Sequence, residues 1–268
     1  VGGAVNVVGT QGGPAQLEVS TIEGPPLGVV QDGSTLTIGY PDLPQLTVRD
    51  WLRRIGRNWD AVRGWFNREN WQRHAVVSLA VPAGTEVEVR VVSAAAVVSG
   101  VSGRVSVRGV DGDTTLVGVT GPVDARTVTG SLDAQSVSGG LRFSTVSGEL
   151  TVVDGSGGQI RADSVSGAMT LDLDLRGRTN VRLNTVSGEV AIRLPDPGDA
   201  RVDANTTSGD VSSAFEELRL SNQCGARRLT GTLGKGRGKL RVSTVSGPVA
   251  LLRRPDFDDA DATAGKVR

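Results

Sequence analysis

The sequence predicts an all-β fold, a parallel β-solenoid or β-helix with two strands in each coil of 18–21 residues, plus one short amphipathic helical insert. Three observations predict this fold. A triplet related to Val-Ser-Gly returns every nine residues through the middle of the chain. Apolar and polar residues alternate between triplets, as in strands with one buried face. The step between alternate triplets is 18 residues at first and grows later to 19 and then 21.

The repeat predicts where each strand and turn lies. The triplets occupy residues 101–103, 110–112, 119–121, 128–130, 137–139, 146–148, 165–167, 186–188, 207–209 and 245–247. Gly at the third position is expected at a turn, because it tolerates backbone conformations that other residues avoid. The first, fifth and seventh positions of each block, such as Val146, Leu150 and Val152, are expected to face inward.

The uneven spacing predicts two different edges. Extra residues enter only the second block of each pair, so one edge of the solenoid should be constant and the other should tolerate loops. The tolerant edge would carry loops at 174–185, 195–206 and 214–243. The coils are expected to stack in chain order, starting at Val92, Val110, Val128, Val146, Val165, Val186, Thr207 and Val245.

The chain divides into three predicted parts. Residues 1–91 are expected to form irregular N-terminal β coils or a cap, including a helical insert at 49–73. Residues 92–255 form the regular solenoid and 256–268 a flexible tail. Within the first part, Asp32-Gly33 predicts a hairpin and Pro82-Ala83-Gly84 a turn.

Residues 49–73 depart from the β pattern. All four Trp lie here, and apolar residues recur at spacings of three and four, as on one face of a helix. Seven Arg make the segment basic within a chain of zero net charge. Such a helix either covers the solenoid as a lid or binds a partner or membrane surface. The candidate partner-binding residues are Trp51, Arg54, Trp59, Trp65, Phe66 and Trp71.

Composition narrows the classes of function. Zero net charge gives no global electrostatic case for nucleic-acid binding. The single Cys, Cys224, excludes an internal disulfide framework. No apolar run approaches the ~18 residues of a transmembrane helix. The chain begins at Val1 rather than Met, so its compartment is open; the single Cys and the lack of a visible signal peptide favour the cytoplasm, with the cell surface as the alternative.

Three groups of polar residues are candidates for ligand binding. Units such as 145–147 and 185–187 place two hydroxyls around a Val that is expected to face inward. Outward hydroxyl arrays resemble those of ice-binding proteins, whereas Ser and Thr also bond turn backbone readily. Residues 154–158 are similar to part of a calcium-binding β-roll, but no Asp recurs in register. Glu189 and Asp210 are predicted to stack one coil apart on the constant edge.

The sequence predicts no enzyme, bound metal or cofactor. Its only His, His74, stands far from any nucleophile motif, and no Gly-x-Ser-x-Gly is present. The stretch 234–239 lacks the Ser or Thr and the first Gly of a phosphate-binding loop, and is expected to be a hairpin tip.

Three stretches carry a family resemblance. Thr145–Glu149 and Thr185–Glu189 repeat Thr-Val-Ser-Gly-Glu, and Ser164–Leu173 is a related unit. The chain resembles a bacterial, actinobacterial-type β-strand-repeat family of unknown function labelled "putative adhesin". That resemblance implies the solenoid fold and no catalytic or ligand residues.

Two functions remain open at this point. The first is a non-catalytic, adhesin-like scaffold that presents the loops of one face to an unknown protein or cell-surface partner. The alternative is an intracellular or membrane-associated scaffold or regulator that docks through 49–73, with peripheral membrane contact. A homo-oligomer is also open, because uncapped terminal coils would associate. No nucleic-acid partner is expected.

Overall fold

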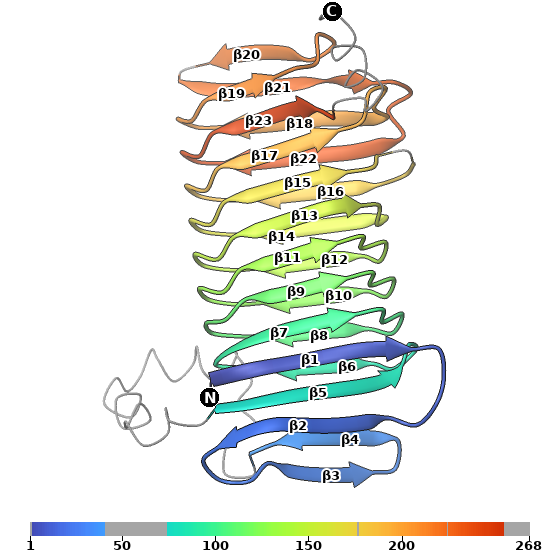
Figure 1. Cartoon of the computed structure of the whole chain (residues 1–268). Coiled ribbons are helices and arrows are strands. Elements are labelled where there is room, and N and C mark those ends of the chain that lie inside the picture. Colours follow the sequence, from blue (N-terminus) through green and yellow to red (C-terminus); the bar gives the residue numbers. More distant parts are fainter. Residues whose placement is uncertain (1, 41–73, 176, 224, 255–268) are drawn as a thin grey trace, which may run out of the picture.

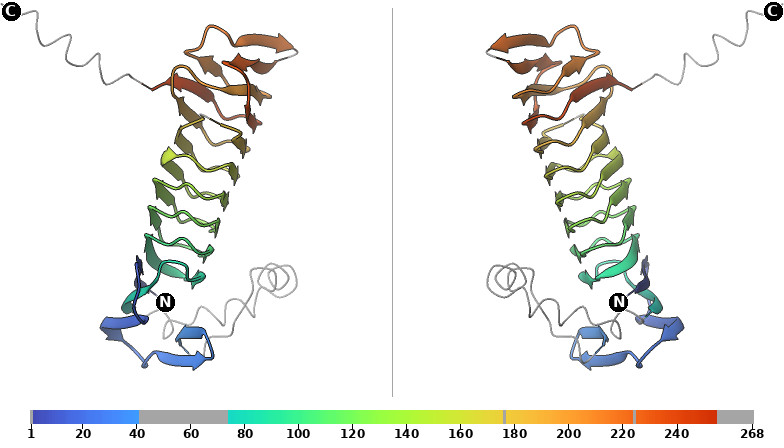
Figure 2. Two further views of the ribbon diagram at one scale, coloured as in Figure 1. Left: turned by 90° about the vertical axis from the view of Figure 1, so that its right-hand side faces the viewer. Right: turned by 90° about the vertical axis from the view of Figure 1, so that its left-hand side faces the viewer.

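The computed structural model describes residues 2–40, 74–175, 177–223 and 225–254, which form a stack of two-stranded coils (Figure 1). The strands make two long, mostly parallel sheets and one small hairpin sheet. Seen edge-on, the two long sheets form two thin layers (Figure 2). The predicted β-solenoid with two strands per coil is therefore confirmed. The described residues contain no helix, so none there could cross a membrane.

The first sheet contains, in spatial order, β19 (Val211–Ser213), β23 (Val249–Arg253), β17 (Val190–Leu194), β15 (Met169–Leu173), β13 (Leu150–Gly155), β11 (Leu132–Gln135), β9 (Thr114–Val117), β7 (Ser93–Ser99), β1 (Gly2–Thr10), β5 (His74–Pro82) and β2 (Gln16–Glu23). The second sheet contains β20 (Arg219–Gln223), β21 (Ala226–Leu233), β18 (Ala200–Thr206), β22 (Gly238–Thr244), β16 (Asn180–Asn184), β14 (Gln159–Asp163), β12 (Leu141–Ser144), β10 (Val123–Arg126), β8 (Val105–Arg108) and β6 (Val87–Arg90). The hairpin sheet pairs β3 (Gly28–Asp32) with β4 (Thr35–Gly39).

A continuous apolar core lies between the two long sheets. Alternate residues of each strand point inward, so Leu150 and Val152 are buried while Thr151 and Val153 face outward. Most inward positions hold Val, Leu, Ile or Ala, and Phe143 is the largest side chain that is fully buried. Small branched side chains suit this core because the two layers stand close together and pack at the density of a protein interior.

The first strand of the chain does not lie at the end of the stack. Strand β1 lies between β5 and β7 and is parallel to both, with Val5 opposite Val77 on one side and Ala96 on the other. Strand β2 then covers the outer edge of β5 in antiparallel orientation. The predicted Asp32-Gly33 hairpin is confirmed between β3 and β4, as is the turn between β5 and β6.

At the other end, the coils do not follow chain order as predicted. Strand β22 lies between β16 and β18, and β23 lies between β17 and β19. The coil that contains Val245 is thus inserted between those of Val186 and Thr207: the amide of Ser246 bonds the carbonyl of Val186, and that of Ser208 bonds Val245. The sequence cannot show this, because both coils carry the same turn motif and fit either position.

The stretch 214–243, expected to be a long loop, is mostly strand. Strand β21 pairs with β18 in antiparallel orientation, and β20 pairs with β21 in the same way and ends the second sheet, before β22 returns into the stack. Residues 174–185 and 195–206 likewise include β16 and β18, which leaves short connections at 174–179 and 195–199. Antiparallel strands at the end of a sheet occupy the edge that would otherwise recruit another chain.

The predicted helix at 49–73 lies outside the described residues. The same holds for its candidate residues Trp51, Arg54, Trp59, Trp65, Phe66 and Trp71, and for the predicted tail 256–268. The helix, its candidate residues and the tail stay predictions.

Candidate functional site

The constant edge is formed by the turns that lead from the second sheet to the first. Its glycines follow one another along the stack without a break from Gly112 to Gly209, with Gly247 in its inserted place. A Cβ added to Gly148 would lie 1.9 Å from the carbonyl oxygen of Gly130, and one on Gly167 would lie 1.8 Å from that of Gly148. The coils approach so closely at this edge that only Gly fits.

A hydroxyl three residues before the glycine fixes the constant turns from Gly130 onward, and from Gly148 onward it is buried. The Oγ1 of Thr185 accepts a bond of 3.0 Å from the amide of Gly188, three residues on. It also donates to the carbonyl of Val165, one coil away, at 3.4 Å. The same pair of bonds is repeated at Thr145, Thr206 and Thr244. Of the two roles considered for these Ser and Thr hydroxyls, the structure supports bonding to the backbone of the turns.

The Val at the centre of most constant turns faces solvent, which corrects the expectation that it points inward. Val146 is 48% exposed, whereas Thr145 before it is 8% exposed. Val101, Val119 and Val137, at the opposite edge, are buried as predicted. The hydroxyl occupies the inner position in constant turns because only it can satisfy the buried glycine amide. Exposed valines form a ridge along this edge at Val92, Val110, Val146, Val165, Val186 and Val245.

Replacing Thr185 by Val tests the structural role of the hydroxyl. The two side chains have nearly the same shape, but Thr185→Val leaves the buried amide of Gly188 without its partner. A buried donor that loses its bond costs about 1–3 kcal/mol. We expect the free energy of unfolding in urea to fall by that amount. Ser187→Ala is the control, because Ser187 is exposed; an equal loss in both variants would contradict the role assigned to Thr185.

Glu189 and Asp210 do not stack one coil apart, contrary to the prediction. Pro248 lies between them: the amide of Val190 bonds the carbonyl of Pro248, and the amide of Val249 bonds that of Asp210. Asp210 instead pairs with Arg227. Because the acids are separated by an inserted coil, they form no shared ligand site. Among the described residues, no group of three His, Cys, Asp or Glu side chains could hold a metal ion.

The variable edge is regular in its first half only. Gly103, Gly121, Gly139 and Gly157 form a second glycine ladder, in which a Cβ on Gly139 would lie 1.9 Å from the oxygen of Gly121. The ladder ends at Gly157, and a Cβ on Gly177 in the next connection would meet nothing within 4 Å. A Cβ on Gly198, in the connection 195–199, would lie 3.3 Å from the side chain of Leu233, so neither Gly177 nor Gly198 has the contact of about 2 Å with a neighbouring coil's backbone that restricts every constant turn.

Several ion pairs lie at or beside the connections 174–179 and 195–199. Asp172 pairs with Arg254, and Arg253 pairs with Asp196 at 3.1 Å. Asp199 accepts bonds from the backbone amide and the side chain of Arg237, which hold its pKa below the ordinary value. The stretch 234–239, expected to form a hairpin tip, instead joins two strands that are not neighbours. Residues 234–237 cross the end of β18, which lies between β21 and β22, and residues 238–239 belong to β22. This segment thus ties the inserted coil to the 195–199 connection.

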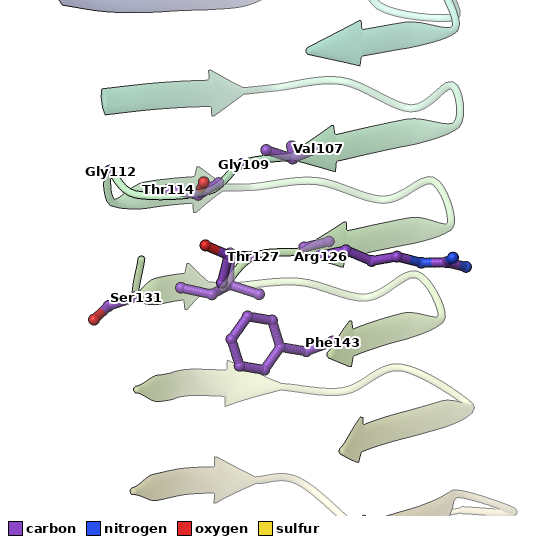
Figure 3. A pocket seen from close by; sticks show the side chains of 10 residues that line it. Val107, Gly109, Gly112, Thr114, Arg126, Thr127, Ser131 and Phe143 are labelled. Carbon is purple, nitrogen blue, oxygen red and sulfur yellow. The ribbon is translucent and has the colours of Figure 1, made fainter. Parts of the chain in front are cut away.

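One small cavity lies beneath the constant edge (Figure 3). It is lined by Gly109, Gly112, Thr127 and Phe143, among others, and has a volume of about 10 Å³. A site of that size holds one water molecule at most. It offers no place for an organic substrate, and no nucleophile and base meet there.

Comparison with known proteins identifies the fold family. Residues 73–252 match the model of the family described as Toastrack DUF4097. Among solved structures, a "putative cell adhesion protein" from Clostridium sporogenes ATCC 15579 is 8% identical, covering 94% of this chain and 89% of its own, with a TM-score of 0.26. No curated protein matches the chain. Since the family model spans well over half of the sequence, the chain belongs to the Toastrack DUF4097 family.

Proposed function

We propose that the protein is a non-catalytic interaction scaffold, and that the connections 174–179 and 195–199 on its variable edge contact a protein partner. The difference between the two edges carries this proposal. Every constant turn from Gly112 to Gly209 is restricted by its neighbour's backbone, whereas the glycine ladder of the variable edge stops at Gly157. Exposed side chains can therefore project from these two connections without disturbing the stack.

Two further features support a binding role. The Toastrack DUF4097 family has no known enzymatic role. Arg178, Asp196 and Pro197 are exposed on the two connections and offer both charges and a rigid ring for contact. The flanking strands β15, β16, β17 and β18 hold the connections in place, so little ordering entropy would be lost on binding.

Site-specific photo-crosslinking in the cells that produce the protein tests the proposal. A photoreactive residue at Arg178 or Pro197 should give one discrete crosslinked species. The same residue at Ser147 or Ser187, exposed on the constant edge, should give none. Crosslinks from the constant edge alone, or from neither edge, would contradict the proposal. An adhesive role requires the captured protein to lie outside the producing cell, and a scaffold role requires it to lie inside.

A further inference from the structure

Charge is distributed unevenly between the two outer faces of the solenoid. In strands β12, β14, β16 and β22 of the second sheet, the charged residues are Arg142, Arg161, Asp163, Arg182, Lys239 and Arg241. In the facing strands β11, β13, β15, β17 and β23 they are Asp133, Asp154, Asp172, Arg193 and Arg253. A chain with no net charge thus has a basic face in the middle of its second sheet.

Four of the basic residues form a single straight row. Arg142 lies opposite Arg161, Arg161 opposite Arg182, and Arg182 opposite Arg241, each in neighbouring parallel strands. Neighbouring strands stand ~4.8 Å apart, so the row is roughly 14 Å long. The row depends on the inserted coil, because in chain order Arg182 would be followed by Asp203 rather than Arg241. We call Arg142, Arg161, Arg182 and Arg241 the arginine row.

The acidic residues at the two ends of the row are paired with other arginines: Asp124, opposite Arg142, pairs with Arg126, and Asp203, opposite Arg241, pairs with Arg228. Arg161 pairs with Asp163 at 2.9 Å, and the positive charge of Arg142 also attracts the carboxylate of Asp163. Arg182 and Arg241 make no ion pair with another described residue, and both side chains are exposed. Like charges directly opposite each other across parallel strands repel. A linear array of anions laid over the row would relieve that repulsion.

The positions beside the arginine row are mostly neutral hydrogen-bonding groups. On one side lie Gln159 and Asn180, opposite each other in β14 and β16. On the other side lie Ser144, Asn184 and Ser243, interrupted only by Asp163. The amide of Asn184 donates to Asp163 at 2.7 Å, so part of this side is preordered. Amide and hydroxyl groups that flank a line of cations suit a ligand that carries hydroxyls beside its anions.

We propose that the arginine row binds one acidic polysaccharide, laid along the solenoid axis with those carboxylates that face the sheet against guanidinium groups of the row. An extended pyranose unit is about as long as the strand spacing of ~4.8 Å, so one sugar can meet each strand. The guanidinium fork pairs with a carboxylate through two parallel bonds, while the flanking amides and hydroxyls meet sugar hydroxyls. This site is separate from the variable edge and does not rest on the partner proposed there.

The same observations disfavour other polyanions. Single-stranded nucleic acid is usually held by aromatic side chains on which its bases stack, and none of the described outward residues of β12, β14, β16 or β22 is aromatic. A duplex is read by an element that enters a groove, whereas this face is a flat sheet. An anionic membrane attracts any basic patch and requires neither a straight row nor hydroxyl-binding neighbours.

Binding of the whole chain to polygalacturonate, which carries a carboxylate on every sugar, tests the inference. Calorimetry or affinity electrophoresis should show binding that weakens as salt rises, and no binding to uncharged dextran. The double variant Arg182→Gln/Arg241→Gln should bind at least tenfold more weakly while its melting temperature stays unchanged or rises, because charge repulsion is removed. The charge-matched control Arg104→Gln/Arg193→Gln alters exposed arginines elsewhere and should change affinity by less than about twofold.

Three results would overturn the inference. Equal binding to dextran and polygalacturonate, or binding to neither, would show that the row has no specific affinity for an acidic polysaccharide. Equal weakening in both double variants would show attraction by overall charge rather than by the row. Tighter binding to vesicles with anionic lipid, or to an unstructured DNA strand, that is lost in Arg182→Gln/Arg241→Gln would assign the row to that ligand instead.

Discussion

Ending the chain after Arg237 is expected to unfold far more than one coil. The deletion removes β22 and β23, whose Leu240, Val242, Val249 and Leu251 are buried in the core. Each such side chain contributes roughly 1.5–3 kcal/mol, so the loss is on the order of 10 kcal/mol, comparable with the whole stability of a typical domain. Because these strands lie inside the stack, β18 and β19 also lose their parallel neighbours.

Hydrogen exchange read peptide by peptide distinguishes this outcome from simple fraying. Amides of β18, β19 and β21 should lose protection together, whereas those of β9 to β12 keep it. A chain that ends at Arg254 is the matched control, because it retains both inserted strands. If coils stacked in chain order, only the last coil would be affected, and protection of β18 would persist after truncation.

Replacing Gly167 by Ala is expected to destabilise the constant edge by roughly 3 kcal/mol or more. The new Cβ would lie 1.8 Å from the carbonyl oxygen of Gly148, a contact that requires the backbone to move. Overpacking in a tight interior typically costs about 1–3 kcal/mol, and here the atom that must move is backbone of the neighbouring coil. The urea midpoint and melting temperature should both fall.

Gly158→Ala provides the comparison for Gly167→Ala. Gly158 lies in a connection of the variable edge, and a Cβ there would meet nothing within 4 Å. Its replacement should change stability by no more than about 0.5 kcal/mol, as for most surface substitutions. A similar loss in both variants would mean that reduced chain flexibility, rather than contact between coils, explains the effect.

The repeat predicted the architecture because a strand's alternation and a turn's glycine are local properties. Val146 was misplaced because alternation alone favours an inward Val, and the buried amide of the following glycine that requires Thr145 inside is a feature of the folded turn. A Thr or Ser stands immediately before Val146, Val165, Val186 and Val245 and is a partial signal, because Ser136 also precedes the buried Val137. The exposure of the ridge follows from the same turn chemistry.

The arginine row and the order of coils could not be found from the sequence. Arg182 and Arg241 are far apart in the chain, and they meet only because β22 lies beside β16. Two coils with the same turn motif can exchange places without changing any local pattern, so pairing between distant strands decides their order. Glu189 and Asp210 were predicted to be neighbours for the same reason.

The placement of the first and last described strands has a mechanical consequence. Strand β1 is held between β5 and β7, and β23 is held between β17 and β19, so neither lies at an end of the stack. Tension applied through these two strands would load interior backbone bonds in shear, along the strands, rather than peel one terminal coil at a time. The molecule is therefore built to resist being unzipped from either end, a property that a chain wound in simple succession would lack.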